Sequence, residues 1–123
     1  MPKYQRFEDL PVWREAARLY NRVLDLLEEP GVPLSTGFRH QLDRAALSVS
    51  NNIAEGFERS RPKEFHQFLS ISTCSCGELR SQLYIALDAA HIDEGIFCHH
   101  LALAEETSRI INGLRASVKR SLR

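Results

Sequence analysis

The chain carries no excess charge of either sign, because 16 Lys and Arg residues balance 16 Asp and Glu residues over 123 positions. No overall electrostatic field therefore draws it to nucleic acid or to anionic lipid, and only a local patch could meet such a partner. The sequence also has no run approaching the ~20 apolar residues of a membrane span, and its first residues do not form the apolar stretch of a secretory signal. We expect a cytoplasmic protein with no membrane partner.

Cysteine is scarce and odd in number, which suits reduced thiols better than a disulfide framework. Cys74 and Cys76 stand two positions apart, about 200° around a helix, so they cannot grip one metal ion. Cys98 stands beside His99 and His100, but adjacent helical residues point about 100° apart and no second Cys/His pair has zinc-finger spacing. We expect neither a metal ion nor a cofactor.

Glycines and prolines are few; they mark breaks at 30–33 and at 59–62, and a third break lies around 91–93. Between these breaks apolar residues recur every three or four positions, which is the period of an amphipathic helix and not of a strand. Short connections leave few ways to bury four apolar stripes. The sequence predicts an all-α fold, one domain over residues 1–123, built as an antiparallel up-and-down four-helix bundle with helices at about 9–29, 36–57, 62–90 and 93–120.

The first predicted helix has two partly apolar faces, so one can pack inward and the other against a neighbouring subunit. One face is formed by Leu10, Trp13, Ala17, Tyr20, Leu24 and Leu27, and the second by Val12, Ala16, Leu19, Val23 and Leu26.

Three side chains are expected to cap the starts of helices: Asp9 for the first helix, Ser60 for the third and Asp93 for the fourth. Gly113 lies inside the fourth predicted helix, where glycine costs about 1 kcal/mol relative to alanine. We expect it to mark close packing or a weak point.

Polar residues follow the second and third predicted helices as two rows of short or planar hydrogen-bonding types, which include Ser48 and Ser75. If the helices fold back at a turn near Arg59, Arg44 comes opposite Glu78. We predict a partly buried Arg44–Glu78 ion pair within an interhelical network, which more often fixes helix register than performs chemistry. The predicted members are Gln41, Arg44, Asn52, Glu55, Glu78 and Gln82.

No catalytic constellation stands out. A di-iron bundle needs Glu-x-x-His motifs, but Glu55, Glu64 and Glu78 are followed at that spacing by other residues. No Gly-x-Ser-x-Gly elbow or phosphate-binding glycine loop is present either. We expect a protein that is not an enzyme.

Basic residues form two groups, one on the first predicted helix and one in the last turns of the fourth, after which no acid follows Glu106. For one neutral subunit, solubility and favourable charge at a helix C-terminus account for them best. Symmetric assembly would repeat each patch and strengthen weak binding to phosphates. The candidate contacts to a partner or to nucleic acid are Arg14, Arg18, Arg22, Arg115, Lys119 and Arg120.

Five motifs spread over nearly the whole chain carry a family resemblance: Phe7-x-Asp9-Leu10-x-Val12-Trp13, Gln41-x-x-Arg44-Ala45-Ala46-x-Ser48, Asn52-Ile53-Ala54-Glu55-Gly56, Glu64-Phe65-x-x-Phe68-Leu69 and Glu78-Leu79-x-x-Gln82-Leu83. With them the chain resembles the bacterial four-helix-bundle proteins first noticed as products of reading frames within intervening sequences of 23S rRNA genes. The resemblance implies an up-and-down bundle that assembles as a ring-like homopentamer. A relative implied by it is the accessory protein of diversity-generating retroelements, a basic pentameric barrel that binds nucleic acid and a reverse transcriptase; the present chain differs in its zero net charge.

The sequence therefore favours a non-enzymatic homo-oligomeric assembly module that binds a protein partner. The alternative is a scaffold that binds RNA or DNA without sequence specificity through repeated basic patches.

Overall fold

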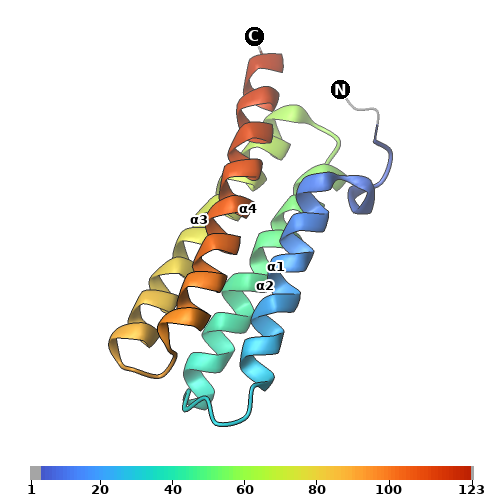
Figure 1. Cartoon of the computed structure of the whole chain (residues 1–123). Helices are drawn as coiled ribbons and strands as arrows, with labels where there is room; N and C mark the ends of the chain where they lie inside the picture. Colours follow the sequence, from blue (N-terminus) through green and yellow to red (C-terminus); the bar gives the residue numbers. More distant parts are fainter. Residues whose placement is uncertain (1–3, 123) are drawn as a thin grey trace.

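Four helices account for most of the chain in the computed structural model, which describes residues 4–122. They are α1 (Pro11–Glu28), α2 (Thr36–Glu58), α3 (Pro62–Asp88) and α4 (Glu94–Ser121), preceded by one short 3-10 helix, η1 (Phe7–Asp9). Figure 1 shows them as an antiparallel bundle in which each helix lies beside the next one in the chain and α4 returns to the side of α1. Residues 4–122 contain no strand, so the prediction of an all-α four-helix bundle is confirmed.

The helix ends follow the expected capping chemistry only in part. Asp93 caps α4 as predicted, because its Oδ1 accepts a hydrogen bond from the Ile96 backbone N–H at 2.8 Å. The other two predictions are wrong: Asp9 lies in η1, where Leu10 separates it from α1, and Arg61 separates Ser60 from α3. Ser60 instead adopts a left-handed φ of 63°, which turns the chain between α2 and α3.

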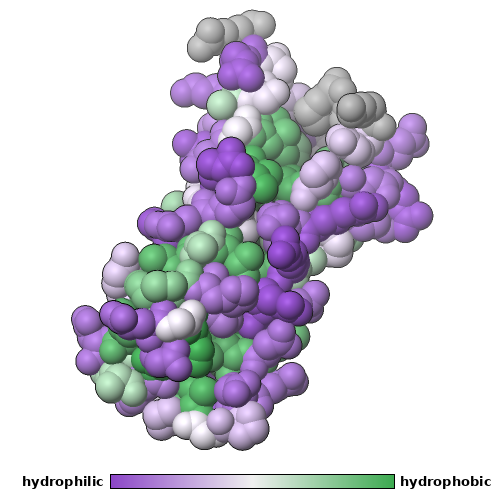
Figure 2. Space-filling view, viewed as in Figure 1, coloured by the Kyte–Doolittle hydropathy of each residue, from purple (hydrophilic) through white to green (hydrophobic). Residues whose placement is uncertain are grey.

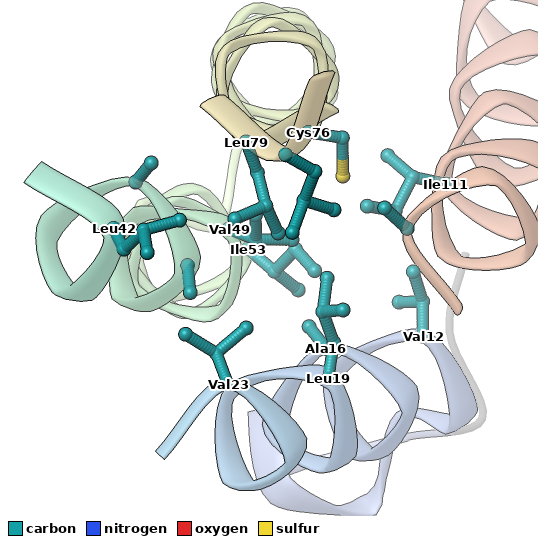
Figure 3. Packing of buried hydrophobic residues seen from close by; sticks show 14 of the residues in the cluster. Val12, Ala16, Leu19, Val23, Leu42, Val49, Ile53, Cys76, Leu79 and Ile111 are labelled. Atoms are coloured by element: carbon teal, nitrogen blue, oxygen red, sulfur yellow. The ribbon is translucent and has the colours of Figure 1, made fainter. Parts of the chain in front are cut away.

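The inward face of α1 is the one formed by Val12, Ala16, Leu19 and Val23, which are buried at the centre of the bundle (Figure 3). Side chains from the other three helices meet them there, among them Ile53, Leu79 and Ile111. Burying one such aliphatic side chain contributes about 1.5–3 kcal/mol, which makes this convergence the main source of stability.

The Trp13 and Tyr20 face of α1 is half-buried and packs against the edge of the core. The Tyr20 hydroxyl donates to Asp43 Oδ1 at 2.6 Å, and this hydrogen bond to a carboxylate raises the pKa of Tyr20. Trp13 packs edge-on against Phe7, with ring centroids 5.3 Å apart. The Trp13 and Tyr20 face is thus partly covered by the chain's own elements, which the apolar spacing alone could not reveal.

Gly56 allows α2 and α3 to approach each other closely. A Cβ at this buried position of α2 would lie 2.6 Å from the Cβ of Phe68 and 3.1 Å from a ring carbon of Phe65, both on α3. Gly113 has no such role, because a Cβ there would meet nothing within 4 Å. Of the two alternatives expected for Gly113, close packing is therefore wrong, and a weak point in the helix stays a prediction; the glycine that packing requires is Gly56.

We predict that Gly56→Ala lowers the free energy of unfolding by about 1–3 kcal/mol, because the added methyl group overpacks the seam between α2 and α3. The matched control, Gly113→Ala, should raise it by up to about 1 kcal/mol, because alanine is the better helix former and finds open space. Urea unfolding followed by circular dichroism measures both. Equal effects of the two substitutions would contradict the assignment of Gly56 as a packing glycine.

Candidate interaction surfaces

The seam between α2 and α3 is closed by short polar side chains. Ser48 Oγ and Ser75 Oγ lie 2.8 Å apart, so the two predicted polar rows do meet. Asn52 Nδ2 donates to the backbone oxygen of Ser48 at 2.8 Å and to its Oγ at 2.9 Å. Ser72, which is fully buried, donates from Oγ to the Val49 carbonyl at 2.7 Å. These bonds turn polar groups of both helices toward each other instead of toward water.

The charged members of the predicted network lie outside it. Arg44 and Glu78 are both exposed and line one shallow hollow, but no ion pair joins them among the described residues. The predicted Arg44–Glu78 pair is therefore wrong, since two charges at the surface keep their hydration at lower cost than a shared burial would demand. Glu55 is exposed as well and pairs with Arg59 at 3.0 Å.

The amide members divide in a similar way. Asn52 belongs to the network, as described above, and Gln82 is buried with its Nε2 donating to the Gln41 backbone oxygen at 3.2 Å. The Gln41 side chain itself is exposed, so this residue contributes through its carbonyl alone.

The outward surface over this seam carries no charge along its middle. Residues 45–54 of α2 and 65–77 of α3 contain no Asp, Glu, Lys or Arg, and the contacts of Ser48 with Ser75 and of Ser72 with Val49 place the two segments side by side. We call this surface the uncharged face. Its exposed residues are Leu47, Asn51, Gln67, Ile71 and Cys74.

The arginine row on α1 is offset by neighbouring acids. Each of the three candidate arginines lies near a carboxylate, in the pairs Arg14–Asp9 at 3.9 Å, Arg18–Glu15 at 3.8 Å and Arg22–Asp25 at 3.1 Å. Such exposed pairs add little stability, but they do reduce the local positive potential.

The cations at the end of α4 have no such partners. Arg109 pairs with Glu106, and its hydrogen bond lowers the pKa of that carboxyl. No acid follows Arg109 up to residue 122. Among residues 4–122, Arg115, Lys119 and Arg120 take part in no ion pair. Lys119 and Arg120 are exposed and Arg115 is half-buried.

An apolar groove of about 630 Å³ opens between α1 and the C-terminal part of α4. Its floor includes Leu10, Phe65, Ile110 and Leu114. Figure 2 shows it as hydrophobic surface between the upper part of α4 and the N-terminal segment. The sequence does not reveal this groove, because its lining residues have the same helical spacing as core positions and come together only in three dimensions.

The thiols differ in exposure. Cys74 and Cys98 are exposed, whereas Cys76 is fully buried and its burial raises the pKa of the thiol to about 12. Within residues 4–122 no group of three or more His, Cys, Asp or Glu side chains is arranged to hold a metal ion. None of the helices described has the length and apolar character needed to cross a membrane.

His100 was also missed as a structural residue. Its ring is buried between α4 and α1, with Nδ1 2.8 Å from the Ile96 oxygen and Nε2 3.0 Å from the Arg22 oxygen. Both partners are carbonyl oxygens, and a neutral imidazole has one N–H to donate to one of them at a time. This contact is a direct polar link between the first and last helices.

We predict that at pH 8 a thiol reagent modifies Cys76 at least ~100-fold more slowly than Cys98, because the raised pKa keeps Cys76 protonated and the core excludes the reagent. In denaturant the two rates should converge. Mass spectrometry of the modified peptides measures both rates, and Cys76→Ser should remove the slow phase only. Equal rates in the native protein would contradict the burial of Cys76.

Comparison with known proteins gives one family. The family model described as 23S rRNA-intervening sequence protein matches residues 8–113, which is well over half of the chain. Among curated proteins, none matches the chain significantly.

Proposed function

The chain belongs to the 23S rRNA-intervening sequence protein family, and we propose that it is a non-enzymatic assembly module whose copies join through the uncharged face. The absence of charge along the middle of α2 and α3 is the observation that supports this most. The family resemblance implies five copies in a ring, and the assembled ring would bind a protein partner. Three free thiols favour the cytoplasm as its compartment.

Charged residues make up 26% of the chain, so a charge-free surface over two paired helices is unusual for a face that stays in water. Depletion of charge in the centre, with charged residues around the rim, is characteristic of protein interfaces. The uncharged face has this arrangement, since Arg44, Glu55 and Glu78 border it. It also exposes aliphatic side chains, with Leu47 at 38% and Ile71 at 47%.

Covering this face would cost little desolvation. The hydroxyl and amide groups nearest to it are already hydrogen-bonded within the seam, as in the Ser48–Ser75 and Asn52–Ser48 contacts. A neighbouring subunit would therefore displace water mainly from carbon atoms and from a few exposed amides, and the net charge of zero adds no repulsion between copies.

We predict that light scattering gives the wild-type chain a mass of several copies, five if the family resemblance holds. Leu47→Glu combined with Ile71→Glu should reduce the mass to one chain, because two carboxylates cannot be buried unpaired in an interface. Ile85→Glu is the matched control: Ile85 is similarly exposed on α3 but lies beyond Glu78, outside the uncharged face.

Cys74 offers an independent readout of the same face. In the assembled wild type it should be protected from a thiol reagent while Cys98 remains reactive, and the double variant should restore its reactivity. A wild-type chain that stays monomeric at micromolar concentration, or a double variant that keeps its mass, would overturn the proposal.

A second function, binding of RNA or DNA, is favoured by the unpaired cations of α4. Arg115, Lys119 and Arg120 follow the last acid of the chain and are free to meet phosphates. A ring would repeat this basic group once per subunit, which multiplies a weak contact. The α1 arginines are weaker candidates, because acids offset their charge.

If nucleic acid is the partner, affinity for a mixed RNA and DNA pool should fall steeply with salt, and Arg115→Ala, Lys119→Ala and Arg120→Ala together should remove most of it. The control, Arg14→Ala with Arg18→Ala and Arg22→Ala, should have a smaller effect. Fluorescence anisotropy at several salt concentrations measures both. Affinity that ignores salt, or that survives the α4 substitutions, would rule out this function.

A further inference from the structure

The two ends of the bundle have opposite charge although the chain is neutral. One end holds the loop between α1 and α2 and the turn between α3 and α4 (Figure 1). Around this end, residues 23–40 and 85–96 contain six acids and a single Lys or Arg, which is Arg39. The other end holds the last turns of α4, where residues 107–122 contain bases but no acid. A uniform mixture of charges would not produce this separation.

The acidic end has a hollow of about 610 Å³ between the loop and the turn. Its apolar lining includes Val32, Ile92 and Ile96, and its acidic lining residues are Glu29 and Asp93. Glu28, Glu29 and Glu94 are exposed here and form no ion pair within residues 4–122. An apolar group that carries positive charge beside it would satisfy both parts of this lining.

The hollow is held in shape before anything enters it. The Arg39 guanidinium donates from Nη2 to the Val32 carbonyl at 2.8 Å and from Nε to the Leu34 carbonyl at 3.1 Å, and it also bonds to the Leu27 carbonyl. Three bonds from one side chain therefore fix the loop between the end of α1 and the start of α2. A preformed site loses little conformational entropy on binding.

The tip of α4 has the matching chemistry. Residues 119–122 are all exposed, and the end of α4 stands above the turn between α2 and α3 (Figure 1). Leu122 is 46% exposed, and Lys119 and Arg120 precede it by three and two positions. The tip thus combines an apolar side chain with unpaired cations.

We propose that copies of this chain associate end to end, with the tip of α4 of one copy seated in the acidic hollow of the next. Leu122 meets Val32, Ile92 and Ile96, while Lys119 and Arg120 face the carboxylates at the rim. The contact joins the C-terminal end of one α4 to the N-terminal end of the next, so the two helix dipoles align favourably. This end-to-end contact uses the ends of the bundle and not the uncharged face, so it does not depend on side-by-side assembly. Where rings form through the uncharged face, the contact would stack one ring on the next.

The test is mass in solution, measured by light scattering on the full chain at about 20 mM and about 300 mM salt, where charges are screened over roughly 20 and 6 Å. The mass at high salt defines the salt-resistant assembly, whatever its size. For the wild type we expect a mass at low salt that is at least twice this value. Three variants should lose the increase: the double variant Glu28→Lys/Glu29→Lys, the double variant Lys119→Glu/Arg120→Glu, and Leu122→Asp. Mid-bundle controls, Glu105→Lys and Arg80→Glu, should keep it.

Mixing the two charge-reversed variants provides the decisive arm. Each alone brings like charges together at the contact, but in the mixture the basic loop end of one meets the acidic tip of the other, and the low-salt increase should return. A mass that does not change with salt overturns the proposal. That is also the result expected if the hollow binds a different protein or a small cation instead of a second copy. Loss of the increase in the mid-bundle controls, or failure of the mixture to restore it, also overturns the proposal. A single-chain mass at high salt would instead count against the proposed assembly through the uncharged face.

Discussion

The close approach of α2 and α3 is the constraint on which the rest of the structure depends. It requires a glycine at position 56, because Phe68 occupies the space that a side chain would need, and it requires hydroxyl groups that bond across the seam at Ser48, Ser72 and Ser75. Around these two helices α1 packs against α2, α4 packs against α3, and α1 and α4 contact each other, which closes the bundle. The buried aliphatic side chains at the centre then follow from the geometry of the seam (Figure 3).

The same constraint shapes the surface. Helices that pair through serine hydroxyls need no charged residues to stay aligned, and the outward surface over the seam is left without charge between Arg44 and Glu55 on one helix and between Glu64 and Glu78 on the other. Charge is concentrated elsewhere, with acids at the loop end and bases at the tip of α4. Sides and ends of the bundle therefore have different chemistry, and they suit different contacts: desolvated and salt-tolerant along the side, electrostatic and salt-sensitive at the ends.

Much of the fold was predictable because it follows from local periodicity and turn chemistry. The number of helices, their approximate limits and the cap at Asp93 can all be obtained from the spacing of apolar residues, prolines and short polar side chains. The polar rows also pointed to the correct seam, where Ser48 meets Ser75. The Arg44–Glu78 pair failed because register arguments place residues on facing helices but do not decide which side chains turn inward and which remain hydrated.

By itself, the sequence determined that this chain is an all-α bundle, which family it resembles, and where along it charge is present or absent, because each of these is a property of residue order. Only the tertiary structure decided which of two apolar faces of α1 enters the core, that Gly56 and not Gly113 permits close packing, and that His100 links α4 to α1. The grooves at the two ends were likewise beyond the sequence. The physical reason is that burial and cavity shape depend on contacts between residues far apart in the chain, where small differences in packing select one of several faces that the local pattern leaves equivalent.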